Sequence, residues 1–153
     1  VQSNPLNRRV LLEVEPRPYK LAVKVGPNPF NPLTTRNPIV DNGMTVREGV
    51  RGIIVVVDPL TNLGDTASEE SVKLTHTMKI YDAQGNHIAG LPDSDQSVAE
   101  IIHSPWSSKS YLVWSGRNND KRYVGAGSYL GIITVSDNRG RQTTTRTMMA
   151  VIR

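Results

Sequence analysis

The chain has 153 residues, 37% of them hydrophobic and 21% charged, so it is long enough to bury a core as one globular domain. It contains no cysteine, which excludes disulfides, thiolate metal sites and cysteine nucleophiles and favours an exported protein. The net charge of +4 comes from Lys and Arg residues scattered along the chain, which argues against a nucleic-acid-binding face. No segment approaches the ~20 apolar residues of a membrane span, so we expect no membrane insertion.

Residues 1–18 differ from the rest of the chain, and we expect the folded domain to occupy residues 19–153. This first segment contains several prolines, the pair Arg8-Arg9 and the apolar run Val10, Leu11 and Leu12. Since the chain starts with Val rather than Met, we expect a processed form or a part of a longer protein. The segment is then either a linker or an extended arm that adds a strand to the sheet edge of a neighbouring subunit.

Apolar and polar residues alternate along most of the chain, which indicates strands with one buried and one exposed face. The run Ile53–Val57 is instead continuously β-branched and predicts a strand covered on both sides. No segment has the apolar spacing of a helix, and turn residues separate the apolar segments. The expected strands are 19–25, 53–57, 74–80, 98–102, 111–114, 129–135 and 143–152, with a further candidate at 10–14. This pattern predicts an all-β, immunoglobulin-like sandwich of about seven to eight antiparallel strands.

Three sequence blocks carry a family resemblance. Residues 26–32 read GPNPFNP, residues 78–86 read MKIYDAQGN, and residues 113–120 read VWSGRNND and lead into VGAGSY at 124–129. In this order the blocks resemble the immunoglobulin-like domain of the flagellar hook-capping protein. They also resemble the C-terminal sorting domains of bacterial proteins secreted by the type IX system. The resemblance covers residues 21–153 and implies a non-catalytic domain.

The residues of these blocks are expected to build the fold. Proline lacks an N–H donor, so the first block predicts a corner, with Phe30 closing one end of the core. Trp114 is expected to pack between the sheets. The complete set of motif residues is Pro27, Asn28, Pro29, Phe30, Asn31, Pro32, Ile80, Tyr81, Asp82, Gly85, Trp114, Gly116, Gly127 and Tyr129. The chain departs from the family pattern at Ser115, where Asp is usual, and in the long stretch 37–73.

The sequence offers no set of residues with catalytic or metal-binding spacing. His76 lies on the apolar face of an expected strand and is interpreted as a hydrogen-bonded core residue, while His87 and His103 lie in or beside loops. Their spacing does not match a metal site. The segment 125–131, GAGSYLG, has neither the spacing of a nucleophile elbow nor that of a dinucleotide fingerprint. Loop carboxylates at 58–70 and 93–95 offer calcium ligands without matching an EF-hand. We therefore expect no enzyme activity, no cofactor and no metal.

Two functions remain open from the sequence. The first is attachment, sorting or assembly through protein partners at a bacterial cell surface, including a role as a subunit of an extracellular filament. The second is a carbohydrate-binding module, in which Trp106 is the candidate platform for stacking on a glycan. The second hypothesis predicts retention on insoluble glycan that is lost in Trp106→Ala.

Overall fold

The computed structural model describes residues 21–59, 74–92, 95–138 and 140–153, and these residues form ten strands and no helix. None of this described part is therefore a helix suited to crossing a bilayer. The strands are β1 (Leu21–Gly26), β2 (Arg36–Asp41), β3 (Met44–Arg51), β4 (Ile53–Pro59), β5 (Leu74–Tyr81), β6 (His87–Leu91), β7 (Ala99–His103), β8 (Ser110–Trp114), β9 (Gly127–Asp137) and β10 (Gln142–Val151). The all-β prediction is confirmed.

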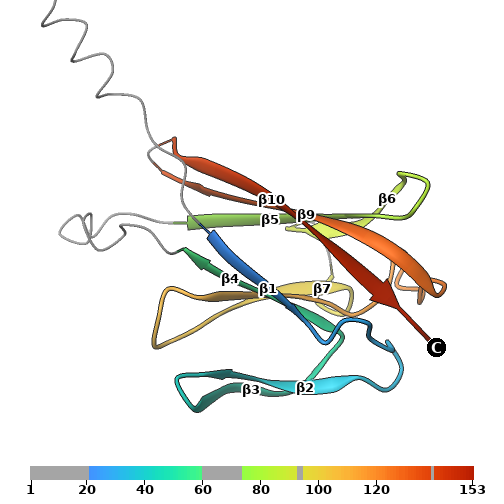
Figure 1. Cartoon of the computed structure of the whole chain (residues 1–153), viewed down its shortest axis with the longest axis horizontal. Coiled ribbons are helices and arrows are strands. Elements are labelled where there is room, and N and C mark those ends of the chain that lie inside the picture. Colours follow the sequence, from blue (N-terminus) through green and yellow to red (C-terminus); the bar gives the residue numbers. More distant parts are fainter. Residues whose placement is uncertain (1–20, 60–73, 93–94, 139) are drawn as a thin grey trace, which may run out of the picture.

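Eight of the ten strands form two four-stranded antiparallel sheets. One sheet has the order β1-β4-β8-β7 and the other has the order β10-β9-β5-β6, and the two lie face to face (Figure 1). This is the strand order of an immunoglobulin fold, with A, B, E and D in one sheet and G, F, C and C′ in the other. The predicted sandwich of seven to eight strands corresponds to these two sheets.

The main core lies between the two sheets. Alternate residues of β5 and β9 point inward, so that Met78, Ile80 and Ile133 are fully buried. They meet Val55, Val57 and Leu112 from the opposite sheet. The period-two pattern at residues 74–80 therefore identifies the buried face of β5 correctly.

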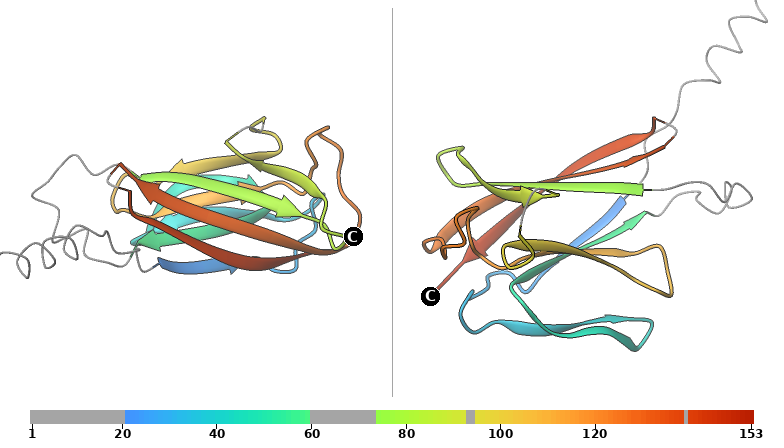
Figure 2. Two further views of the ribbon diagram at one scale, coloured as in Figure 1. Left: turned by 90° about the horizontal axis from the view of Figure 1, so that it is seen from above. Right: turned by 180° about the vertical axis from the view of Figure 1, so that it is seen from behind.

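A hairpin of β2 and β3 forms a third layer on the outer face of the β1-β4-β8-β7 sheet (Figures 1 and 2). It covers that face with a second core, in which Ile39 and Val50 of the hairpin pack with Ile54, Tyr111 and Val113. Strand β4 is consequently covered on both sides. This arrangement explains its uninterrupted β-branched run and confirms that part of the sequence interpretation.

The predicted strand list lacks β2, β3 and β6. The hairpin turns at Asn42 and Gly43, whose φ angles of 54° and 77° are those of a type I′ turn. Asn-Gly is the strongest short-range hairpin signal, so the sequence did contain a usable cue at this point. The flanking strands conceal it because few of their side chains are buried and their register is irregular.

Candidate functional site

The first motif block lies along the last strand and closes one end of the core. The Phe30 N–H donates to the Ala150 carbonyl at 2.9 Å, and the Ile152 N–H donates to the Phe30 carbonyl at 2.9 Å. The Phe30 ring is 1% exposed and meets Trp114 edge to face, with ring centroids 5.7 Å apart. The corner therefore also pairs with β10 through Phe30, which forms a parallel bridge with Val151.

The amides of Asn28 and Asn31 complete the hydrogen bonding of this block. The Asn28 side chain donates to the Met148 carbonyl at 2.9 Å and accepts from the Ala150 N–H at 2.8 Å. The Asn31 side chain accepts from the Leu33 N–H at 2.9 Å. These side chains replace strand pairing that the prolines cannot provide.

The second block forms the β5–β6 hairpin. The Asp82 carboxylate accepts from the backbone N–H groups of Gln84 (3.0 Å) and Asn86 (2.8 Å), and these bonds, led by that of Asn86, hold its pKa below the usual value. The Gly85 N–H donates to the Asp82 carbonyl at 3.0 Å. Tyr81 packs edge to face with His87 at 5.4 Å between ring centroids. Asp82 is thus the organising residue of a turn.

The third block surrounds Trp114, which is fully buried and donates from Nε1 to the Arg117 carbonyl at 2.9 Å. The Tyr129 ring lies 5.3 Å from it, and Tyr129 Oη donates to the Gly125 carbonyl at 2.7 Å. A tyrosine near the start of strand F that bonds back to upstream backbone is the tyrosine corner of immunoglobulin-like domains. Gly127 begins β9, and Gly116 lies against the ring of Pro32.

Two of the three histidines lie near each other. The rings of His76 and His103 are 5.8 Å apart, and His103 Nδ1 lies 3.0 Å from Ser110 Oγ. Burial and then the charge of His103 lower the pKa of His76 to about 4. His76 is buried as expected, but both of its ring nitrogens lack a hydrogen-bond partner among the described residues, so the expected hydrogen bond is wrong. Within the described ranges, no three His, Asp or Glu residues gather to hold a metal.

Trp106 is 44% exposed on a loop that is anchored to the β2–β3 hairpin. Its N–H donates to Ser104 Oγ at 3.1 Å, and Ser104 Oγ and Ser107 Oγ donate to Asp41 Oδ2 at 2.5 and 2.7 Å. These two hydroxyl bonds, with Lys109 3.5 Å away, lower the pKa of the buried Asp41 carboxyl. The loop presents the indole to solvent from a fixed position.

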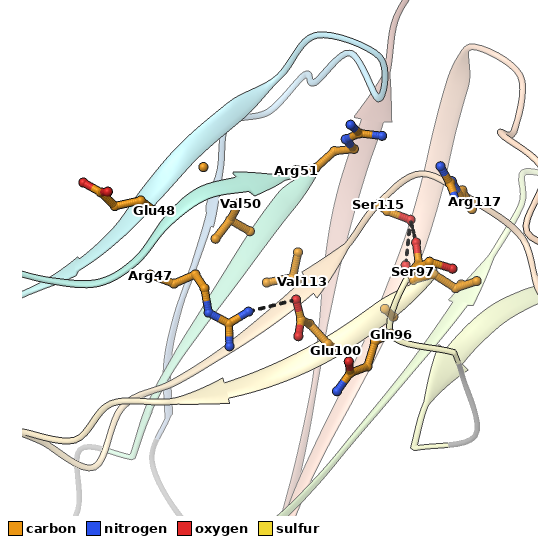
Figure 3. A pocket seen from close by; sticks show the side chains of 13 residues that line it. Arg47, Glu48, Val50, Arg51, Gln96, Ser97, Glu100, Val113, Ser115 and Arg117 are labelled. Carbon is orange, nitrogen blue, oxygen red and sulfur yellow. Dashed lines mark hydrogen bonds and ion pairs between the residues drawn. The ribbon is translucent and has the colours of Figure 1, made fainter.

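Five charged side chains line a groove between β3 and β7, which we call the arginine groove (Figure 3). It encloses about 320 Å³, and Val50 and Val113 line its apolar part. Arg47 crosses it to Glu100 with an N–O distance of 3.4 Å. Figure 3 shows Arg51 and Arg117 at the other end, with Glu48 directed away from both.

Arg51 and Arg117 converge on a single neutral oxygen. Arg51 Nη1 donates to Tyr123 Oη at 3.0 Å and Arg117 Nη2 donates to the same oxygen at 2.9 Å. The Arg117 guanidinium also lies 4.6 Å from the centre of the Tyr123 ring. The bond from Arg117, followed by the bond from Arg51, lowers the pKa of Tyr123. Across the hairpin, Arg36 lies directly opposite Arg51 and adds a further positive charge.

These arginines have no acidic partner within the described residues. The ion pairs of that part of the chain join Arg47 to Glu100, Lys109 to Asp41, Lys121 to Asp95 and Arg141 to Asp137, and none involves Arg51 or Arg117. Arg117 Nε is buried and also lacks a hydrogen-bond partner among these residues. The groove lining carries three arginines and two glutamates, and the end with Arg51 and Arg117 is the part that attracts an anion.

Among the described strands, β7, one wall of the groove, lies at an edge of its sheet. The Ser115 N–H donates to the Val98 carbonyl at 2.9 Å, and the Ser104 N–H donates to the Lys109 carbonyl at 3.0 Å. Both bonds fit the register of β7 with β8, so the backbone of the even-numbered residues faces β8. Ile101 and His103 accordingly direct their N–H and C=O groups to the open side, where another strand can pair with them.

The sequence analysis did not find the arginine groove. Arg51, Arg117 and Tyr123 are brought together by the third layer and by the turn after β8. No spacing of residue types signals this cluster, because its members come from segments distant in the chain. The motif residues, by contrast, lie in the core and in turns.

Comparisons with known proteins add little. No protein-family model and no curated protein matches the chain, so the family resemblance stays a prediction. Among solved structures, the chain is similar to PorZ, an essential bacterial surface component of the type-IX secretion system of Porphyromonas gingivalis. The two share 19% sequence identity, and the match covers 86% of this chain and 12% of PorZ with a TM-score of 0.42. The fold assignment rests on the strand order and not on this distant similarity.

Proposed function

We propose that this chain is a non-catalytic module of the bacterial cell surface that attaches to, or assembles with, other proteins by binding an extended acidic segment in the arginine groove. The observation that carries the proposal is the convergence of Arg51 and Arg117 on Tyr123 Oη without a carboxylate. Placement outside the cell rests on the cysteine-free composition and on the resemblance of the three motif blocks.

A carboxylate is the ligand that this cluster favours. Two guanidinium groups held close together repel each other, and the neutral phenol between them does not offset their charge. An incoming carboxylate offsets both charges and accepts the strong, geometrically specific hydrogen bonds that arginine makes with carboxylates. A planar anion therefore binds here with a more favourable free energy than an apolar or cationic group.

The neighbouring sheet edge favours an extended polypeptide as the carrier of that carboxylate. The outward-facing backbone groups of Ile101 and His103 provide main-chain hydrogen bonds, as in recognition by strand addition. Ala99 and Ile101, on the opposite face of β7, provide an apolar surface for the alternate side chains of the same segment. The β7 edge and the groove beside it thus offer main-chain, apolar and charged contacts to one strand.

The test is a fluorescence-anisotropy titration with a labelled peptide in which valine and glutamate alternate. We expect the peptide to bind, and we expect Arg51→Glu to weaken binding about tenfold or more, because a hydrogen bond between charged groups is worth about 1.5–3 kcal/mol. Arg146→Glu, an exposed arginine on β10 of the other sheet, is the matched control and leaves binding unchanged. Added salt weakens the interaction.

Other outcomes would overturn the proposal. Equal binding of a valine–lysine peptide, or equal affinity in Arg51→Glu, would remove the arginine groove as the site. Retention on insoluble glycan that survives Arg51→Glu but is lost in Trp106→Ala would instead favour the carbohydrate-binding alternative, for which the fixed, exposed Trp106 indole is the supporting observation.

A further inference from the structure

We infer that the segment bound in the arginine groove is residues 10–15 of a second copy of this chain. The inference rests on the proposed function and names its partner. Residues 10–15 read VLLEVE and lie outside the described residues, as does the whole of the predicted arm with Val10, Leu11 and Leu12. In an extended strand, Leu12 and Val14 share one face while Glu13 and Glu15 share the other.

The two faces of such a strand match the two sides of the β7 edge. Within β7, Ala99 and Ile101 face the core between the sheets, whereas Glu100 and Ile102 face the groove side. A strand added beside β7 presents one face of its side chains to each side. Leu12 and Val14 then extend the main core over Ile101, which that core buries only in part.

The same placement directs Glu13 and Glu15 to the groove side of the sheet. There they provide the carboxylates that Arg51 and Arg117 lack within the described residues. The reverse placement puts glutamates against the core and leucine against arginine, which is unfavourable on both faces. The alternation of the segment therefore fixes which face meets the groove.

A copy cannot insert its own segment. Leu21 pairs with Pro59 at one end of β4, whereas Ile53 at the other end pairs with Trp114 near the arginines. Six residues of strand cover about 20 Å along the sheet, and three strand spacings from β1 to β7 cover about 14 Å across it. Leu21 therefore lies about 25 Å from the end of β7 that is near the arginines. Glu15 and Leu21 are six residues apart and span at most about 21 Å. The donor must be a second molecule.

Donation from one copy to the next is a head-to-tail contact. The arm and the groove are different surfaces, so each molecule can give one arm and receive another. Unless the rotation between copies closes a ring, this type of contact produces an open chain. The structure thus assigns a polymerising role to the same groove.

The test is sedimentation velocity of the full chain over a range of concentrations. We expect the chain to self-associate, and we expect association to weaken about tenfold or more in Arg51→Glu and in the double variant Glu13→Lys/Glu15→Lys. Mixing the two variants restores pairing, because the unaltered glutamate arm of Arg51→Glu meets the unaltered groove of the double variant, and the lysine arm of the double variant meets the glutamate groove. Arg146→Glu, the matched control, associates like the parent chain.

A parent chain that stays monomeric at every concentration would overturn the inference, as would association that all these variants leave unchanged. A mixture of the charge-reversed variants that forms no heterodimer would also overturn it. Failure of the inference is distinguishable from failure of the proposed function. A monomeric chain that still binds the valine–glutamate peptide through Arg51 retains the function and takes its acidic segment from another protein.

Discussion

Individual side chains define the two ends of the sandwich in different ways. At one end, Phe30, Trp114 and Tyr129 meet edge to face, an arrangement that contributes about 0.5–1.5 kcal/mol per ring pair beyond burial. Away from this aromatic group, His76 is 8% exposed and its ring nitrogens have no partner within the described residues. A buried, unsatisfied imidazole destabilises the fold, so His76 is a weak point of the core.

The unfolding free energy should depend on pH through His76. In the folded chain its pKa is about 4, whereas an unfolded histidine titrates near 6.5. The unfolded chain therefore binds a proton first as the pH falls, and the unfolding free energy falls between pH about 6.5 and about 4 by up to about 3 kcal/mol. His76→Leu removes this fall and raises stability at neutral pH, as urea unfolding over that range will show.

Two observations keep this prediction specific. His87→Leu, at an exposed position, is the control and should retain the fall. The carboxyl of Asp41, whose pKa lies below its ordinary value of 3.8, loses its contribution only at lower pH, so the two windows separate. A pH dependence that persists in His76→Leu would show that another group causes it.

Among the elements, the β2–β3 hairpin has the unusual position. An immunoglobulin-like sandwich needs only the two sheets, and here the connection between β1 and β4 is enlarged into a third layer. Asp41, at the end of β2, ties the hairpin to the loop between β7 and β8 through Ser104, Ser107 and Lys109. This single carboxylate also fixes the loop that carries Trp106.

Asp41→Ala should loosen the hairpin without unfolding the sandwich. The substitution leaves two hydroxyls and an ammonium group without their acceptor, so hydrogen exchange should quicken at residues 36–51 while β5 and β9 keep their protection. Asp120→Ala, which removes an exposed carboxylate from a turn, is the control. Unchanged exchange in the hairpin would show that its apolar contacts alone hold it.

At the scale of the whole molecule, the β1-β4-β8-β7 sheet is sandwiched between two layers. On the outer face of this sheet, the hairpin covers Ile54, Tyr111 and Val113. The same third layer positions Arg47 and Arg51 opposite β7, so it creates the arginine groove as it covers the sheet. Stability and the candidate interaction site therefore depend on one inserted element.

Removal of the hairpin should uncover an adhesive apolar face. The Gly52 N–H donates to the Thr35 carbonyl at 3.4 Å, so a short Asn-Gly loop can replace residues 36–51 without moving the sheets. We expect the shortened chain to bind a hydrophobic dye, to aggregate and to lose the valine–glutamate peptide. Adding Ile54→Thr and Val113→Thr should suppress the aggregation. A shortened chain that stays monomeric without dye binding would contradict the role given to the third layer.

The sequence by itself determined the fold class and the residues of the main core. Alternation along β5 identified Met78 and Ile80 as inward-facing, and the continuous run of β4 predicted cover on both faces. These features are local. The backbone of a strand sets the two-residue period of its side chains, so a few consecutive residues show which face is buried.

Only the tertiary structure shows which element covers the second face of β4 and which positively charged side chains lie close together. Arg51 comes from β3, whereas Arg117 and Tyr123 lie in the turn after β8, and the pairing of Arg51 and Arg117 on one oxygen follows from the docking of the hairpin on the sheet. Charge repulsion depends on the distance between two groups in space and not on their separation along the chain. A sequence with scattered arginines therefore does not show which of them lie close together. The candidate site is thus a product of packing, and the motifs that could be read in the sequence built its scaffold.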